Sequence, residues 1–192
     1  MALPFDSQPD LSGGRLRIRP LLSNDLEDLY LAASAPEIWA GHPSTDRYRR
    51  EVFEPYARTL LESGGTLVII DRAENRIIGC SRYYVSPDQP ESISIGFTFL
   101  HHSRWGGGTN FELKRLMLDH AFLTFSEVWF HISPINVRSQ HATKKLGAEY
   151  IGNAVLDLSG QPSHWMCFRL SKKAWELTCH DRSWSSESAA RK

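Results

Sequence analysis

Several short segments of the chain alternate between apolar and polar residues, which is the pattern of half-buried strands. In the clearest of them, at 92–100, the large apolar side chains are expected to share one face: Ile93, Ile95, Phe97 and Phe99. The other predicted strands, marked by alternation or by short apolar runs between turn formers, lie at 15–20, 66–72, 76–84, 128–132, 148–157 and 163–170. The pattern therefore predicts about seven strands.

Apolar residues at helical spacing predict four helices between these strands. They lie at 25–33, 46–63 and 111–125, and from an N-cap at Asn136 to a stop at Gly147. A run of antiparallel strands followed by one parallel strand–helix–strand crossover makes a mixed, mostly antiparallel twisted sheet. The predicted fold class is therefore α/β, an α+β mixed sheet flanked by four or more helices.

Length and composition indicate one domain with two tails. A chain of 192 residues that is 41% hydrophobic can bury a full core. Two prolines and two glycines in residues 1–14 predict a flexible arm, and the polar, Ser-rich segment 179–192 predicts a disordered tail. We expect the single domain to span 15–178.

Charge and cysteine content exclude several classes of protein. Twenty-two basic and twenty-two acidic residues give no net charge, which argues against nucleic acid as a partner. The three cysteines, Cys80, Cys167 and Cys179, have no metal-binding spacing, so we expect unpaired thiols, no metal and a cytoplasmic location. The chain has no basic, apolar leader and no run of about 18 apolar residues, so we expect no membrane contact.

A triple glycine, Gly106–Gly108, separates the strand at 92–100 from the helix at 111–125. Glycines there let the backbone approach a ligand, and free N–H groups at a helix N-terminus attract anions such as phosphate. A tight turn without a ligand is the alternative. The spacing matches neither a P-loop nor the GxGxxG loop of dinucleotide-binding proteins.

Several landmarks in order resemble the GNAT superfamily of acetyl-CoA-dependent N-acetyltransferases. They are Ile95-Gly96-Phe97-Thr98, Trp105-Gly106-Gly107-Gly108-Thr109-Asn110, Asn136 with Ser139, and Lys145-Leu146-Gly147-Ala148. The nearest branch is the RimJ/RimL-like one, which acetylates ribosomal-protein N-termini. The resemblance covers about 15–170 and implies the GNAT fold, with acetyl-CoA as a cosubstrate.

The resemblance also implies a set of site residues. Those expected to bind acetyl-CoA are Phe97, Phe99, Trp105, Gly106, Gly107, Gly108, Thr109, Asn110, Asn136, Ser139 and Lys145. The backbone at Phe97 and Thr98 is expected to hold the carbonyl oxygen, Ser139 to protonate the departing thiolate, and Asn136 to hold pantetheine. On spacing alone, Asn136 and Ser139 are better explained as helix-capping residues.

The chain departs from the family pattern where a carboxylate often precedes Ile-Gly, because it has Ser94 there. The general base is therefore open, and the candidates near in sequence are Glu91, His101, His102 and His141. At pH 7 it costs about 3 kcal/mol more to deprotonate lysine than an α-amine. An enzyme without a strong base should therefore favour α-amines. Asn110 is a second departure, because it stands where the family has Gly or Ala.

Other polar and aromatic residues allow two interpretations each. Lys114, Arg115 and Arg138 could reach phosphates or be solvated. Large aromatic residues and one histidine could line an acceptor pocket or belong to the core: Trp39, Tyr83, Tyr84, Trp129, Trp165 and His131.

These observations favour transfer of acetyl from acetyl-CoA to a primary amine, with a protein or peptide N-terminal α-amine as the leading acceptor. Two alternatives remain: acetylation of a small amine such as an amino acid or antibiotic, and a catalytically weakened CoA-binding module. Relatives of the resembled family are often dimers, so a homodimer is open.

Overall fold

The computed structural model describes residues 5–189, and within that range the chain forms one mixed sheet. Its strand order is β1-β2-β3-β4-β5-β6-β8-β7, and every neighbouring pair is antiparallel except β5 and β6. The strands are β1 Leu11–Ser12, β2 Leu16–Pro20, β3 Thr66–Asp71, β4 Arg76–Ser86, β5 Gln89–Leu100, β6 Glu127–Ile132, β7 Glu149–Asp157 and β8 Pro162–Ser171. The predicted fold class is confirmed, and the short strand β1 is the one that the sequence pattern missed.

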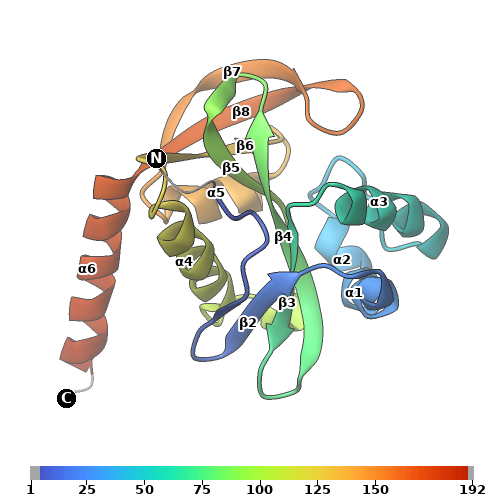
Figure 1. Ribbon diagram of the computed structural model, residues 1–192, viewed down its shortest axis with the longest axis horizontal. Helices are drawn as coiled ribbons and strands as arrows, with labels where there is room; N and C mark the ends of the chain where they lie inside the picture. Colours follow the sequence, from blue (N-terminus) through green and yellow to red (C-terminus); the bar gives the residue numbers. More distant parts are fainter. Residues whose placement is uncertain (1–4, 190–192) are drawn as a thin grey trace.

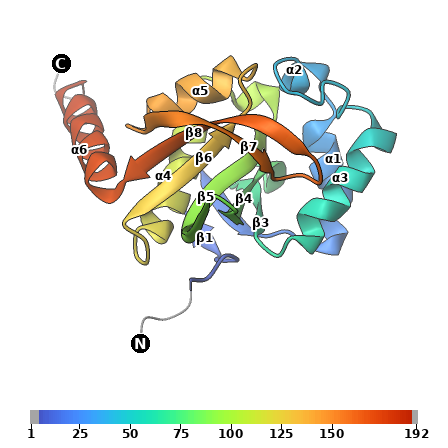
Figure 2. The same ribbon diagram turned by 90° about the horizontal axis from the view of Figure 1, so that it is seen from above.

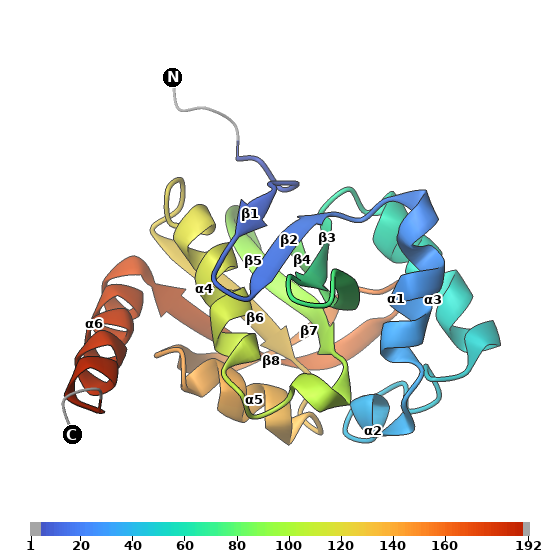
Figure 3. The same cartoon turned by 90° about the horizontal axis from the view of Figure 1, so that it is seen from below.

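Helices cover both faces of the sheet (Figure 1). They are η1 Ser23–Asp25, α1 Leu26–Ala33, α2 Pro36–Trp39, α3 Arg50–Glu62, η2 His102–Arg104, α4 Thr109–Ala121, α5 Val137–Lys144 and α6 Lys172–Ala189. Figures 2 and 3 place α4 and α6 toward one end of the molecule and α1 and α3 toward the other. Within the described range, none of these helices has the length and apolarity needed to cross a membrane.

Two apolar clusters fill the space between the sheet and its helices. One packs β2–β6 and β8 against α4 and the start of α6, and the other packs β3–β5 against α1, α2 and α3. Strand β5 contributes to both clusters: Ile93 and Ile95 belong to the first, whereas Phe99 belongs to the second and Phe97 packs against it. The prediction that these four side chains share one face is therefore wrong.

A β-bulge in β5 explains this change of face. Gly96 pairs with Arg82 and Phe99 pairs with Cys80, so two residues of β5 lie opposite one residue of β4. Phe97 accommodates the extra residue with a φ of 51°, which is rare for a residue with a side chain. An extra residue reverses the alternation of side chains beyond it.

The segment before α3 differs from the prediction as well. The sequence places the second helix at 46–63, but α3 begins at Arg50, and Arg49 before it is extended with a ψ of 133°. The chain between α2 and α3 is instead a loop that contains His42 and Arg47. This loop faces the site described below.

The N-terminal arm is attached to the core rather than flexible from residue 5 onward. The ring of Phe5 lies 5.1 Å from that of Tyr83 and 5.1 Å from that of Phe125. A ring nitrogen of His120 lies 2.7 Å from the carbonyl oxygen of Asp6, within hydrogen-bonding distance. One aromatic anchor thus overrides a composition typical of disorder; the predicted arm at residues 1–4 lies outside the described residues.

The C-terminal segment also differs from the sequence prediction, because α6 runs to Ala189 where a disordered tail was expected from residue 179. The first turns of α6 are anchored: Trp175 is buried and donates a hydrogen bond to Asp119 at 2.7 Å, and Thr178 donates to the carbonyl of Leu146 at 3.1 Å. Once a first turn is fixed, each further residue of a helix adds a hydrogen bond that offsets the entropy lost by fixing it. Residues 190–192 lie outside the described range.

Candidate functional site

A cavity of about 900 Å³ lies where β5 and β6 separate. These parallel strands are paired at two positions, Ile93 with Val128 and Ser94 with Trp129. Beyond these pairs both strands contribute lining residues, Gly96–Leu100 from β5 and Phe130–Ile132 from β6. Backbone groups of β5 past Ser94 thus have no ladder partner on β6 in the described structure, which leaves this edge available to a ligand.

The bulge of β5 forms part of the cavity wall. Phe97, Thr98 and Phe99, which the family resemblance assigns to the acetyl-CoA site, all line the cavity. On the side away from β6, the Cys80 thiol donates to the Phe97 carbonyl at 3.6 Å. Thr98 Oγ1 is hydrogen-bonded to Ser81 at 2.7 Å. The bulge is therefore held from the β4 side.

Lys114 lies directly behind this bulge, within α4. Its ammonium donates to Thr98 Oγ1 at 2.8 Å and to Ser81 Oγ at 3.3 Å, and burial lowers its pKa from 10.5 to about 7. Lys114 is buried, so its interpretation as a solvated charge is wrong, but it also lines the cavity, and a contact with phosphate stays a prediction. Arg115 beside it is exposed and lies 3.6 Å from Asp119.

We expect the buried amine of Lys114 to make stability depend on pH. Above pH 10.5 the amine is neutral in both states, whereas between pH 10.5 and about 7 only the unfolded chain binds the proton. Stability should therefore fall by up to about 1.4 kcal/mol per pH unit as pH decreases through this window, and then level off below pH 7. Lys114→Met should lack this dependence, which urea unfolding at pH 6 to 9 would measure.

An exposed lysine provides the matched control for that experiment. Lys144→Met, in α5, should give a curve parallel to that of the unmodified protein, because Lys144 is exposed. A constant difference between the unmodified protein and Lys114→Met from pH 7 to 9 would contradict the burial of a titrating amine.

The glycine loop leads directly into α4. Gly106 and Gly108 both have a φ of 81° and both line the cavity, and Gly108 is the N-cap of α4. Trp105 and Asn110 also line the cavity, whereas Gly107 and Thr109 do not. The N-terminus of α4 therefore opens onto the cavity, which is the arrangement that binds phosphate groups in proteins.

Two residues that the sequence analysis missed hold this loop. Arg15 Nη1 donates to the carbonyl of Gly107 at 2.8 Å, and Arg15 Nε donates to Glu112 Oε2 at 2.9 Å. The backbone N–H groups of Arg15 and Leu16 donate to Glu112 Oε1 at 2.7 and 3.1 Å. Although burial acts to raise the pKa of Glu112, these donors lower it. The sequence feature that could have indicated this contact is Glu112 itself, a glutamate in the first turn of a helix that follows glycines.

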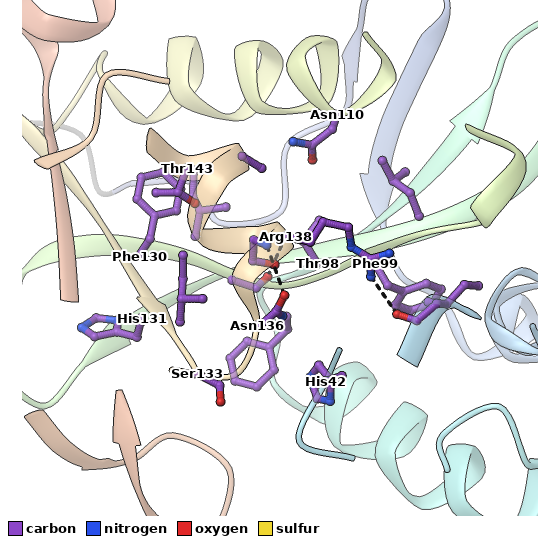
Figure 4. Close-up of a pocket in the computed structure, with 18 of the residues that line it drawn as sticks. His42, Thr98, Phe99, Asn110, Phe130, His131, Ser133, Asn136, Arg138 and Thr143 are labelled. Carbon is purple, nitrogen blue, oxygen red and sulfur yellow. Dashed lines mark hydrogen bonds between the residues drawn. The ribbon is translucent and has the colours of Figure 1, made fainter. Parts of the chain in front are cut away.

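The start of α5 contributes two predicted residues. Asn136 Oδ1 accepts a hydrogen bond from the Ser139 N–H at 3.1 Å, so the capping interpretation is confirmed, and both residues also line the cavity. In the described part of the chain, the Ser139 hydroxyl has no hydrogen-bond partner. Figure 4 shows Asn136 near the centre of the cavity, with Asn110 on one side and His42 on the other. Lys145, at the C-cap of α5, lines the cavity as well.

Arg138 does not extend freely into the solvent. Its guanidinium lies 4.0 Å from the centre of the Trp105 ring and donates to the Ile38 carbonyl at 2.9 Å. The Trp105 indole in turn donates to the Leu100 carbonyl at 3.0 Å. Arg138 therefore connects α5, the glycine loop and α2 across the cavity, a position that the sequence did not indicate.

A chain of hydrogen bonds leads from the cavity wall to the surface. The Tyr84 hydroxyl, on β4, lies 2.9 Å from His131 Nδ1, and His131 Nε2 lies 3.3 Å from the carboxylate of Asp88. Tyr84 lines the cavity, the His131 side chain is fully buried, and the Asp88 side chain is 23% exposed. Burial lowers the pKa of His131, which Asp88 partly offsets, and burial raises the pKa of Tyr84.

This hydrogen-bonded chain lies beside the position where the family carboxylate is absent, because Tyr84 is the register partner of Ser94. Of the bases suggested by sequence proximity, His141 lines the cavity, whereas Glu91, His101 and His102 do not. Sequence reasoning could not assemble Tyr84, His131 and Asp88, because they come from two strands and a turn.

The thiol of Cys167, on β8, completes the one group among the described residues that could hold a metal ion. Its sulfur and the ligand atoms of Asp88 and His131 lie within 4.8 Å of one another. Sequence spacing predicted no metal, since these residues are far apart in the chain. His131 Nε2 also lies 3.4 Å from an Asp88 oxygen, so these two side chains interact directly with each other.

The aromatic candidates divide into two groups. Trp39, Tyr84 and Trp165 line the cavity, together with Tyr56, which the sequence analysis did not single out. Tyr83 instead faces α4 and donates to the Met117 carbonyl at 2.6 Å, and Trp129 donates to Glu127 at 2.9 Å. Alternation along β4 explains the difference between Tyr83 and Tyr84, because neighbouring residues of a strand point to opposite faces.

Comparison with known proteins agrees with this geometry. The family model for the acetyltransferase (GNAT) domain matches residues 15–149. A GCN5-related N-acetyltransferase from Brucella melitensis is similar in structure, with a TM-score of 0.74 and 18% identity over 91% of this chain and 84% of that chain.

Two further structures contain coenzyme A in some form. RimJ of Mycobacterium smegmatis, in complex with CoA-disulfide, has a TM-score of 0.61 and 18% identity over 87% of this chain and 90% of that chain. The aminoglycoside acetyltransferase AAC(6')-Ib, in complex with coenzyme A and kanamycin, has a TM-score of 0.62 and 20% identity over 85% and 98%. At these identities the likenesses support the fold alone, whereas the family model spans most of the sequence. The chain therefore belongs to the GNAT family of acetyltransferases, which use acetyl-CoA as the acetyl donor.

Proposed function

We propose that this protein transfers acetyl from acetyl-CoA to the α-amine of a protein or peptide N-terminus. The observation that carries the proposal is a cavity that has the glycine loop and N-terminus of α4 on one side and an aromatic wall with a proton-accepting chain on the other. Trp105 before the glycines supports the RimJ/RimL-like branch, where a tryptophan is familiar at this position. Acetylation of a small amine is the alternative within the same chemistry.

The residues on the donor side fit a nucleotide. Left-handed glycines at 106 and 108 leave space without a Cβ, and the cavity is large enough for a ligand of considerable size. We assign the pyrophosphate to the loop of Gly106–Gly108 and the N-terminus of α4. Asn136 and Ser139 would face the pantetheine. Bound there, acetyl-CoA supplies an activated thioester carbonyl.

The bulge in β5 would hold the carbonyl oxygen as negative charge develops on it. The donors would be the backbone N–H groups at Phe97 and Thr98, and because the bulge is held in place before the reaction, little reorganisation would be needed. The Lys114–Thr98 hydrogen bond fixes this segment from behind. The Ser139 hydroxyl, which has no partner among the described residues, is free to donate to the departing thiolate.

The amine proton would leave through Tyr84. Asp88 would accept a hydrogen bond from the Nε2–H of His131, so that Nδ1 of His131 is unprotonated. Tyr84 would then pass its hydroxyl proton to Nδ1 as it takes a proton from the amine. Burial keeps His131 neutral near pH 7 and thus able to accept. These three hydrogen-bonded residues would supply a base although the family carboxylate is replaced by Ser94. That replacement was the only support for a catalytically weakened CoA-binding module.

The test combines acetyl-CoA binding by calorimetry with thiol release against peptides, free amino acids, aminoglycosides and polyamines at several pH values. We expect saturable binding, and turnover with α-amines near neutral pH. Turnover restricted to aminoglycosides or polyamines would overturn the N-terminal acceptor. Acetyl-CoA binding without turnover on any amine would contradict the catalytic proposal.

A further inference from the structure

The cavity is lined by basic side chains and by no carboxylate among the described residues. No aspartate or glutamate occurs among its described lining residues, although the chain as a whole has equal numbers of acidic and basic residues. The lining residues with basic side chains are His42, Arg47, Arg104, Lys114, His131, Arg138, His141 and Lys145. Phosphates account for positive charge at the glycine loop, but they do not account for Arg47.

Arg47 lies in the loop between α2 and α3, next to His42, which Figure 4 shows across the cavity from Asn110 of α4. Its guanidinium carbon is 3.8 Å from the centre of the Tyr56 ring and 5.6 Å from that of Trp39. Stacking of this kind holds the planar guanidinium in place and leaves its N–H edge for a ligand. His42, 3.4 Å from Arg47 Nη1, lies with Asn136 between it and Asn110 in Figure 4.

Nothing in the described structure neutralises Arg47. The neighbouring arginines of this region are paired with acids, Arg49 with Glu51 and Arg50 with Glu27, but Arg47 forms no ion pair within residues 5–189. Burial and the charge of Arg47 lower the pKa of His42 to about 4, so the one polar partner of Arg47 is neutral. The guanidinium therefore carries a full, uncompensated charge.

A second arginine strengthens the positive potential from behind the wall. The guanidinium carbon of Arg82 lies 4.7 Å from the centre of the Phe97 ring, and Arg82 also has no ion pair in the described range. Its buried Nε has no hydrogen-bond partner among the described residues, and burial lowers its pKa. Two arginines without acids beside one pocket favour an anion there.

We propose that Arg47 forms a carboxylate subsite, so that the acceptor is an amine that carries a carboxylate close to the amino group. This inference rests on the proposed function and names its substrate class. A carboxylate can form two parallel hydrogen bonds with a guanidinium, which fixes the acceptor's orientation. The carboxylate could belong to the acidic first residues of a peptide or to a free amino acid. Polycationic amines would be repelled.

The test uses substrates that differ in one carboxylate. Peptides that begin with Asp or with Asn are compared, as are free alanine and alaninamide, and spermidine is the cationic probe. We expect kcat/KM to favour the carboxylate member of one pair by about tenfold to a hundredfold, mainly through KM. Preference confined to the peptide pair identifies an acidic N-terminus, and preference confined to alanine identifies an amino acid.

Arg47→Gln should remove this preference with little change in kcat, and Arg47→Lys should restore part of it. Arg49→Gln, an exposed arginine outside the cavity, should change neither. Thermal unfolding of each variant identifies any loss through misfolding. Equal kcat/KM for both members of each pair in the unmodified protein would overturn the subsite. So would an equal effect of Arg47→Gln on both members of the pair in which the unmodified protein shows a preference.

Failure of the proposed function is detected separately. If no amine is acetylated, calorimetry measures binding of the acetylated products instead. The two pairs are N-acetyl-Asp and N-acetyl-Asn peptides, and N-acetylalanine and its amide. Tighter binding of a carboxylate member, lost in Arg47→Gln, supports the subsite without any turnover. Equal binding within both pairs rejects it.

Discussion

Replacing Tyr84 with phenylalanine is expected to lower kcat about a hundredfold to a thousandfold, because general base catalysis typically contributes effects of this size. The variant removes one oxygen atom and breaks the hydrogen bond to His131. The ring itself can still pack over Gly96, to which it lies so close that a Cβ on Gly96 would be only 2.9 Å from it. Acetyl-CoA binding should be unchanged. Steady-state kinetics on the best acceptor, with calorimetry of acetyl-CoA, measures both quantities.

The pH profile provides a second readout of the same prediction. Because burial lowers the pKa of His131 below 6.5, kcat/KM of the unmodified protein should hold as pH falls through 6.5 and decrease only at more acidic pH. In Tyr84→Phe, kcat/KM should no longer show this decrease at acidic pH. Tyr150→Phe, an exposed tyrosine on β7, is the control and should behave like the unmodified protein. Full activity of Tyr84→Phe would show that proton transfer through Tyr84 and His131 is not part of the mechanism. Loss of activity with a chelator would instead implicate a metal at Asp88, His131 and Cys167.

Gly108→Val is expected to weaken acetyl-CoA binding about a hundredfold, equivalent to about 2.7 kcal/mol. Gly108 has a φ of 81° at the N-cap of α4, and a β-branched residue strongly disfavours that conformation. Relaxation of the backbone would turn the first N–H groups of α4 away from the pyrophosphate. The added side chain would also occupy space in the cavity wall, because its Cβ would lie 3.3 Å from Nη2 of Arg15.

The neighbouring glycine provides the matched control. Gly107 is exposed, lies outside the cavity lining, has no atom within 4 Å of an added Cβ and is not among the left-handed glycines. Gly107→Val should therefore change the dissociation constant by no more than about threefold, or about 0.6 kcal/mol. Similar losses in both variants, or unchanged binding in Gly108→Val, would contradict the assignment of the pyrophosphate to this loop.

Local sequence patterns predicted the strands and helices but not the register in which the strands pair. Alternation located β5, and glycines located the start of α4, because both signals lie within one segment. The bulge at Phe97 depends on how β5 pairs with β4, so the sequence of β5 alone indicated an unbroken strand. For the same reason, the shared face predicted for Phe97 and Ile95 was wrong.

The candidate site divides in the same way. Asn136 could be placed because an N-cap is a short-range feature, and the family landmarks located Phe97, Thr98 and Ser139. The sequence left Lys114 as a phosphate contact or a solvated charge, because no local pattern indicates that Ser81 and Thr98 of the sheet accept hydrogen bonds from its ammonium. The Tyr84–His131 contact joins residues 47 positions apart, and only the completed sheet brings them together.

The separation of β5 from β6 has a thermodynamic consequence. With two residue pairs at this junction, few backbone hydrogen bonds join the two parts of the sheet, and a nucleotide bound there would bridge them. Ligand that binds only the folded state adds stability by mass action, about 2.7 kcal/mol at a hundred times its dissociation constant. The cell's supply of acetyl donor would thus determine how long the protein survives proteolysis, as well as how fast it works.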